Sequence, residues 1–255
     1  MSWCATPQPW KFSGRSITVE LGGIEFKSVH VRNEWPEWGL EEITGLWDSG
    51  PRDVETVRTG RGHRVVSDQS APRLVTWRGL LEVSPHEEAP LTLLAAMDEI
   101  RGLPDGVVRF LETDYGLYRE GDCRVVEATV TPISDRHATY RVTVSLDDPL
   151  LYSADEVALP SSVQNAGDHD AFPLITVQGP ASSPVVTVGG TSIPIGQSLT
   201  ASQTAVVDCA NGDVWVGNSR VFPSVGAWPV IRPGQSVSIA VSSGQGRARR
   251  VSAWR

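Results

Sequence analysis

One stretch divides this chain. It reads Leu146-Asp147-Asp148-Pro149-Leu150-Leu151-Tyr152 and, after a polar run, Phe172-Pro173-Leu174-Ile175-Thr176-Val177-Gln178-Gly179. An alternating strand pattern ends at the Asp-Pro pair, because proline cannot donate a backbone hydrogen bond to a sheet ladder. A fresh strand pattern begins after the polar run. This break predicts two modules, residues 1–152 and residues 153–255, with residues 153–170 as a linker at the start of the second.

The first module shows the patterns of several β-strands and a single helix. Between residues 139 and 146 apolar residues alternate with polar ones, which is typical of an antiparallel strand with one face in water. Between residues 90 and 101 apolar residues recur at helical spacing instead. These residues are Leu93, Ala96, Met97 and Ile100. We therefore expect a sandwich-like β module with one packed helix.

Residues 32–64 differ from the rest of the first module. They are aromatic, charged and poor in aliphatic residues, so they cannot build much core of their own. We expect them to form a protruding arm or loop system. The candidate contacts to another subunit or a partner in this segment are Trp35, Trp38, Trp47, Arg61 and His63. The tryptophans could instead be covered locally by the module itself.

The second module has only strand and turn patterns. Its strands are short and turn signals recur about every 8–12 residues, which is the pattern of a β-sandwich. The predicted fold class is therefore mainly β, with two sandwich-like modules. Trp215 and Trp228 are candidates for stacking against a sugar if they reach the surface, and core positions are the alternative.

Charge and hydropathy exclude several classes of partner. The net charge is −8, and residues 153–255 are neutral with six acidic residues and six arginines, so residues 1–152 carry the whole deficit. An acidic module argues against specific nucleic-acid binding. No apolar run approaches the ~20 residues of a membrane helix, and the first residues lack the pattern of a signal peptide. We expect a protein that is made in the cytoplasm and spans no membrane.

Motifs of catalysis are missing from the sequence. It contains neither a Gly-x-Ser-x-Gly elbow nor a phosphate-binding loop. Asp168-His169-Asp170 is the only cluster that resembles metal ligands, and such residues are also common in turns. Asp147 and Asp148 are adjacent on a strand and would point to opposite faces. We therefore expect no enzyme, no metal and no cofactor.

Several motifs, in this order, resemble those of siphophage distal tail proteins. Residues 140–152 resemble the strand and Asp-Pro-Leu-x-Tyr close of the first domain in that family. Residues 172–179 resemble the opening of its second domain. Residues 228–234 and Trp254-Arg255 resemble the Pro-Gly turn and the final Trp-Arg of that domain.

The resemblance implies a structural protein of the phage tail tip, a minor tail protein of the baseplate hub. The first domain would form a ring, usually hexameric, around the tail channel, and the second would be a galectin-like sandwich that projects outward. Implied partners are further copies of the chain, the tail tube protein, the tape-measure protein and the hub or receptor-binding proteins. We further expect an acidic channel wall, since like charge keeps DNA from binding.

Two other classes of function stay open from the residues alone. A carbohydrate-binding module would rest on the second sandwich and would take a host glycan. A glycoside hydrolase would need a carboxylic acid and a carboxylate placed across a cleft. Sequence patterns do not place side chains across a cleft.

Overall fold

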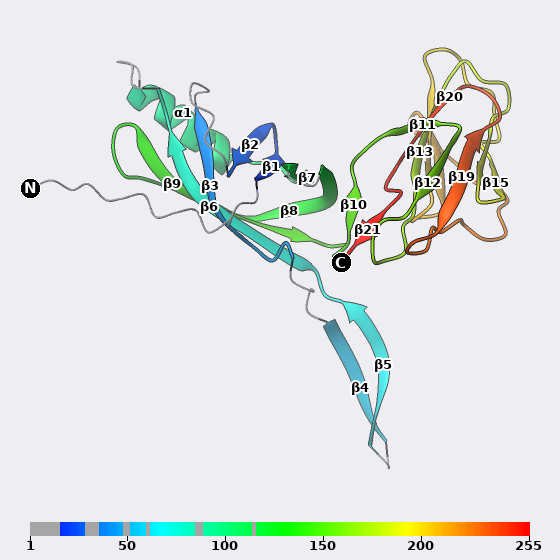
Figure 1. Ribbon diagram of the computed structural model, residues 1–255, viewed down its shortest axis with the longest axis horizontal. Helices are drawn as coiled ribbons and strands as arrows, with labels where there is room; N and C mark the ends of the chain where they lie inside the picture. The colour runs from blue at the N-terminus through cyan, green and yellow to red at the C-terminus, as the bar shows by residue number, and fades with distance from the viewer. Residues whose placement is uncertain (1–15, 29–35, 48–51, 60–61, 85–88, 114–115) are drawn as a thin grey trace, which may run out of the picture. The chain divides into compact units, whose positions relative to one another are not determined.

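The computed structural model describes residues 16–28, 36–47, 52–59, 62–84, 89–113 and 116–255, and within 52–59, 62–70 and 89–90 it describes the backbone only. The chain divides into two compact units, Met1–Pro149 (unit 1) and Leu150–Arg255 (unit 2), whose ribbons are drawn in Figure 1. Strands dominate both units, so the predicted mainly β fold is confirmed. In the described part of the chain, no helix is long and apolar enough to cross a membrane.

Unit 1 contains nine strands and one helix among its described residues. In chain order they are β1 (Ile17–Leu21), β2 (Ile24–Lys27), β3 (Glu37–Thr44), β4 (Arg52–Thr59), β5 (Gly62–Ser70), β6 (Arg73–Glu82), α1 (Ala89–Arg101), β7 (Gly106–Glu112), β8 (Leu117–Pro132) and β9 (His137–Leu146). The β1–β2 hairpin turns at Gly22 and Gly23, whose φ angles of +61° and +90° suit glycine.

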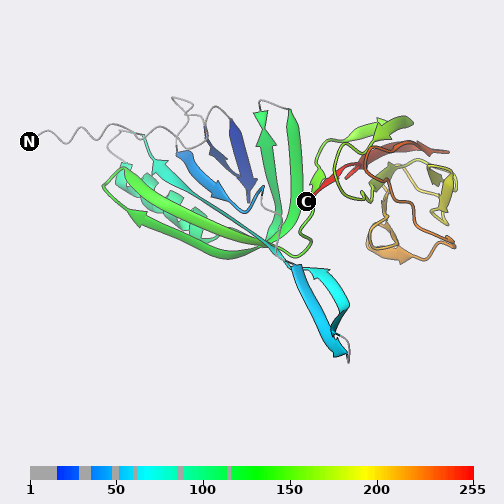
Figure 2. The same ribbon diagram turned by 60° about the horizontal axis from the view of Figure 1, so that its bottom comes forward.

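The main sheet of unit 1 closes on itself. Its strands follow the order β8-β7-β1-β2-β3-β6-β9, and β9 pairs with β8 again. Closure is possible because β8 is 16 residues long: residues 117–123 pair with β7, and residues 123–132 pair with β9. The result is a barrel-like sheet, whose long strands run across the picture in Figure 2. The sequence predicted a sandwich-like module instead. Strand patterns show which residues form strands, but they do not show that the first and last strands of a sheet pair.

Aromatic side chains fill the core of unit 1 beside the helix. The Phe26 ring lies 5.5 Å from the ring of Trp77 and 5.2 Å from that of Tyr140, measured between centroids. Trp38 packs on both Phe26 and Tyr140. The apolar stripe predicted for α1 is buried, which confirms the helix; Leu93, Ala96, Met97 and Ile100 are all at most 6% exposed. α1 packs on the closed sheet, with contacts to β8.

The predicted arm at residues 32–64 needs correction. β3 takes residues 37–44 into the main sheet, where it pairs antiparallel with β6, and Leu40 is fully buried. β4 and β5 form a separate hairpin, and no other described strand pairs with it. The segment therefore supplies a core strand first and a separate hairpin afterwards.

Unit 2 consists entirely of short strands and loops, as the sequence predicted. The strands are β10 (Leu151–Ser153), β11 (Val157–Leu159), β12 (Ser161–Gln164), β13 (Leu174–Gln178), β14 (Val185–Val188), β15 (Thr191–Pro194), β16 (Thr204–Asp208), β17 (Asp213–Val216), β18 (Ser219–Val221), β19 (Ser236–Val241), β20 (Gln245–Arg249) and β21 (Ala253–Trp254). One sheet has the order β11-β20-β13-β16-β17-β18 and the other β12-β19-β14-β15. Both sheets contribute to one apolar core, so the unit is a sandwich.

Residues 153–170, expected to form a linker, are ordered elements of unit 2. β11 and β12 lie in this range, and each is an edge strand of one of the two sheets. Asn165 follows β12 and is fully buried. Its amide NH₂ donates to the carbonyls of His169 and Ile231, and its amide oxygen accepts from the N–H groups of Gly167 and Ala253. The polar run looks like a linker in sequence because its side chains bind backbone instead of forming an apolar stripe.

Candidate interaction surfaces

A broad polar face covers the four long strands β3, β6, β9 and β8 of unit 1. Arg78 on β6 and Arg141 on β9 lie directly opposite each other, an arrangement that like charges disfavour. Each is paired with an acid on the outer side: Arg78 with Glu42 at 2.5 Å, and Arg141 with Glu127 at 3.9 Å. Together with Glu41 and neighbouring threonines these residues form a polar surface that contains a shallow pocket of about 300 Å³.

At both margins of this four-stranded sheet, the outer strand extends past its partner, β7 at one margin and β2 at the other. Cys123 on β8 pairs with Gly106 of β7 and with Leu146 of β9, so β7 and β9 lie on opposite sides of β8. β7 pairs with β8 only up to Cys123, so residues 124–132 have no partner in β7, and the N–H of Val125 donates to the Asp105 carboxylate. At the other margin, β2 reaches β3 only at Gly39, and residues 40–44 face no described strand on that side. Such unpaired margins are the usual template for strand pairing with another chain.

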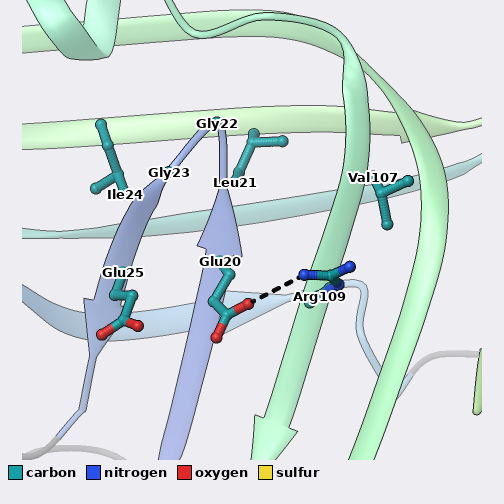
Figure 3. Close-up of a pocket in the computed structure, with 8 residues that line it drawn as sticks. All are labelled: Glu20, Leu21, Gly22, Gly23, Ile24, Glu25, Val107 and Arg109. Atoms are coloured by element: carbon teal, nitrogen blue, oxygen red, sulfur yellow. Dashed lines mark ion pairs between the residues drawn. The ribbon is translucent and has the colours of Figure 1, made fainter. Parts of the chain in front are cut away.

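A second pocket lies at the β1–β2 hairpin and measures about 220 Å³ (Figure 3). Glu20 on β1 and Arg109 on β7 point toward each other across it, 3.8 Å apart. Glu25, which also lines the pocket, is paired with Lys27 at 2.8 Å. Both carboxylates of this pocket are thus held in ion pairs.

Buried charges behind this pocket are paired with one another. Glu120 on β8 is 1% exposed and lies 3.5 Å from Arg109. The Tyr118 hydroxyl donates to Glu20 at 2.8 Å. Burial and this hydrogen bond raise the pKa of Tyr118 to about 12, so the phenol stays protonated at neutral pH. The cluster thus holds β1, β7 and β8 together.

The candidate contacts of the first module fall into separate environments. Trp38 is 6% exposed and belongs to the aromatic core, so the module itself covers this side chain. Trp47 is 43% exposed and stays a candidate contact. His63 lies on β5, where its backbone pairs with Arg58, and its side chain is outside the described part. Trp35 and Arg61 lie outside the described residues.

The two tryptophans proposed for sugar stacking also differ. Trp228 is half-buried against the core of unit 2, and a Cβ added to Gly212 would come within 2.9 Å of its indole nitrogen. Trp215 is 39% exposed on β17. Its cross-strand partner on β18 is Arg220, whose guanidinium carbon lies 5.0 Å from the ring centroid of Phe222. Phe222 is 79% exposed.

Sequence reasoning missed Arg220 and Phe222 as neighbours of Trp215. The signal was present, because Gly217-Asn218 marks a tight turn that brings Trp215 opposite Arg220. Phe222 directly follows the end of β18, and only the structure shows that its ring lies beneath the Arg220 guanidinium.

The Asp168-His169-Asp170 cluster serves the local fold. The Asp168 carboxylate contacts His169 Nδ1 at 2.9 Å and accepts from the backbone N–H of Arg255 at 2.9 Å. Partial burial acts to raise the pKa of Asp168, but these contacts outweigh it and lower that pKa. Among the residues that the structure describes, no group of three or more potential ligands could hold a metal ion.

No protein-family model matches the chain, and no curated protein matches it in sequence. Solved structures do match. The Dit protein (gp 19.1) of phage SPP1, described as a paradigm of the hub adsorption apparatus in phages that infect Gram-positive bacteria, matches with a TM-score of 0.55 and 12% identity, over 91% of this chain and 97% of that one.

Two structures of the phage p2 baseplate in its activated conformation, with Sr and with Ca, each match with a TM-score of 0.50 and 11% identity, over 92% of this chain and 98% of theirs. Identities this low establish a likeness of fold alone. The chain therefore shares its fold, over nearly its whole length, with proteins of phage hubs and baseplates.

Proposed function

We propose that this chain is a structural subunit of a phage tail tip, and that copies of it form a ring, hexameric by resemblance, around the tail channel. The observation that carries the ring is the pair of unpaired margins on the β3-β6-β9-β8 sheet. The fold match to hub and baseplate proteins supports the location in the virion.

The two margins belong to different strands, so their pairing would be heterologous. The β8 margin of one copy would meet the β3 margin of the next, and repetition of the same contact generates a closed ring when the rotation closes. Each contact would pair backbone groups of one margin with those of the other. The tail tube protein, the tape-measure protein and the hub or receptor-binding proteins would be the neighbours of this ring.

The expected acidic channel wall stays a prediction. On the polar face of this sheet, Arg78 and Arg141 are each matched by a glutamate, and the exposed Glu41 lies beside both in a pocket of the same face. If this face lined the channel, DNA would pass ion pairs, threonine hydroxyls and this additional carboxylate.

Two exposed apolar residues on unit 1 allow a matched test of the ring. Val126 lies within the unpaired margin of β8 and is 61% exposed; Ile133 lies just beyond the strand and is 63% exposed. Val126→Lys places a charge on the margin, a device that natural edge strands use against pairing. Native mass spectrometry and electron microscopy of the concentrated protein and of isolated tails would detect rings.

We expect rings with the unaltered chain and with Ile133→Lys, and fewer rings with Val126→Lys. Tails that contain the protein in any arrangement other than a ring would contradict the proposal. A carbohydrate-binding module as the whole function is less well supported, because the fold match extends over unit 1 as well as unit 2.

A further inference from the structure

Three exposed side chains of unit 2 form one surface cluster at the edge of the larger sheet. Trp215 and Arg220 are cross-strand partners on β17 and β18, and Phe222, just after β18, lies against the Arg220 guanidinium. The opposite face of β17 is buried, with Val214 and Val216 in the core. The cluster therefore lies on β17, a strand whose opposite face packs into the core of unit 2. We call Trp215, Arg220, Phe222 and Asp213 the β17–β18 patch.

Polar groups of the patch lie among its aromatic rings. Asp213 lies on the same face of β17 as Trp215, and its carboxylate accepts a hydrogen bond from the Arg220 guanidinium. The Arg220 guanidinium also covers the Phe222 ring. The Arg220 side chain is 44% exposed and that of Asp213 is 16% exposed. An ion pair that is already oriented thus lies beside an exposed indole.

We propose that the β17–β18 patch binds a neutral saccharide. The apolar C–H face of a sugar ring would pack on the Trp215 indole, which offers a large rigid surface. Sugar hydroxyls both donate and accept, so one would donate to the Asp213 carboxylate and another would accept from Arg220, and both hydrogen bonds would be charge-assisted. Phe222 would extend the platform beneath a second sugar ring.

The position of the ion pair favours a saccharide over a protein partner. Protein interfaces place apolar side chains at the centre and charges at the rim. Here the charges lie between Trp215 and Phe222, so an apolar partner surface would strip water from Arg220 and Asp213 without replacing its hydrogen bonds. A saccharide supplies hydroxyls at that point and keeps these groups satisfied.

Charge argues against a nucleic acid as the ligand, although bases also stack on aromatic rings. Asp213 neutralises Arg220, the cation nearest to Trp215. Residues 153–255 hold as many acidic residues as arginines, so the unit that carries the patch has no surplus of positive charge for a polyanion. The ligand that fits the patch is therefore uncharged.

The test uses the full chain on an array of neutral hexose, hexosamine and deoxyhexose oligosaccharides. The strongest ligand is then titrated by calorimetry and tryptophan fluorescence. We expect binding by the unaltered chain that Trp215→Ala weakens by about tenfold or more, with Trp215→Phe between the two. Phe222→Ala should weaken binding of oligosaccharides more than that of the monosaccharide.

Trp47→Ala is the matched control, because Trp47 is similarly exposed at 43% but belongs to unit 1. It should leave saccharide binding unchanged, and thermal unfolding should show that every variant is folded. Failure of every oligosaccharide to bind, or binding that survives Trp215→Ala, overturns the proposal. Patch variants that fail to enter tails while no saccharide binds overturn it in favour of a protein partner. None of these outcomes depends on whether the chain forms a ring.

Discussion

Gly79 lies on β6 where β3 and the ring of Tyr140 leave no room for a side chain. A Cβ at this position would come within 1.8 Å of the Gly39 carbonyl oxygen and 2.8 Å of the Tyr140 hydroxyl. That hydroxyl donates to the same Gly39 oxygen at 3.0 Å. The close approach of β3 and β6 therefore allows the buried Tyr140 hydroxyl to reach a hydrogen-bond acceptor.

The change Gly79→Ala tests this packing. The obstructing atom belongs to backbone, so relief requires β3 to move, and we expect a loss of roughly 3 kcal/mol or more in the free energy of unfolding. Gly106→Ala on β7 is the control, because a Cβ there meets nothing within 4 Å. Chemical denaturation measures both variants, and equal stability of Gly79→Ala and the unaltered chain would contradict the packing described.

Two buried thiols predict a loss of stability in alkali. Burial raises the pKa of Cys123 to about 11 and that of Cys209 to about 12. Since an unfolded thiol ionises near pH 8.5, the folded protein holds these protons more tightly than the unfolded chain does. The stability that the thiols contribute is complete below that pH and is lost as the pH rises toward these raised values.

Thermal unfolding between pH 7 and pH 11 measures this loss, and Cys209→Ser should flatten the decline. Alkylation with iodoacetamide at pH 8, read by mass spectrometry, gives a second measurement. We expect Cys123 and Cys209 to react far more slowly in the folded protein than after denaturation, because the thiolate is the reactive form. Rapid alkylation of Cys209 in the folded protein would contradict its burial.

At the scale of elements, Asn165 connects three segments of unit 2 that are distant in sequence. Its side chain binds backbone groups of His169, Ile231 and Ala253. Ala253 belongs to β21, which pairs with β10 at the start of the unit. One amide thus joins the loop after β12 to the last strand of the chain.

Asn165→Ala should destabilise unit 2 by roughly 2–4 kcal/mol, because it leaves several buried backbone groups without partners. Gln164→Ala is the control, since Gln164 is exposed and its side chain donates only to the Gly234 carbonyl. Hydrogen exchange at the Ala253 amide gives a local measurement and should accelerate in Asn165→Ala alone. Unchanged exchange there would show that β21 is held by other contacts.

The β3 strand shows why element prediction failed at one place. Trp38, Leu40 and Ile43 are all buried, but their spacing does not follow strict alternation. A register shift between Leu40 and Glu42 breaks the two-residue period, so the segment looked like an aromatic, charged arm. A bulge is a property of strand pairing, and the single strand does not reveal it.

At the scale of the whole molecule, each unit has a core of its own. The apolar core of unit 2 is made entirely of residues from 152 to 253. We expect residues 150–255 to fold when expressed alone, with cooperative thermal unfolding and dispersed amide resonances. A chain of these residues that stays unfolded would show that unit 2 requires unit 1. Residues 1–149, expressed in the same way, provide the matching measurement.

By itself the sequence determined the mainly β class of the fold and helix α1, and it predicted a break at residues 146–179 and named Trp215 as a candidate. These rest on short-range periodicity and turn chemistry, which act between residues close in the chain. Only the tertiary structure decided that β8 closes the sheet with β9, that Trp38 is buried while Trp215 is exposed, and that Arg220 and Asp213 lie beside it. Those outcomes depend on which distant strands pair and in which register, and local patterns do not specify that pairing.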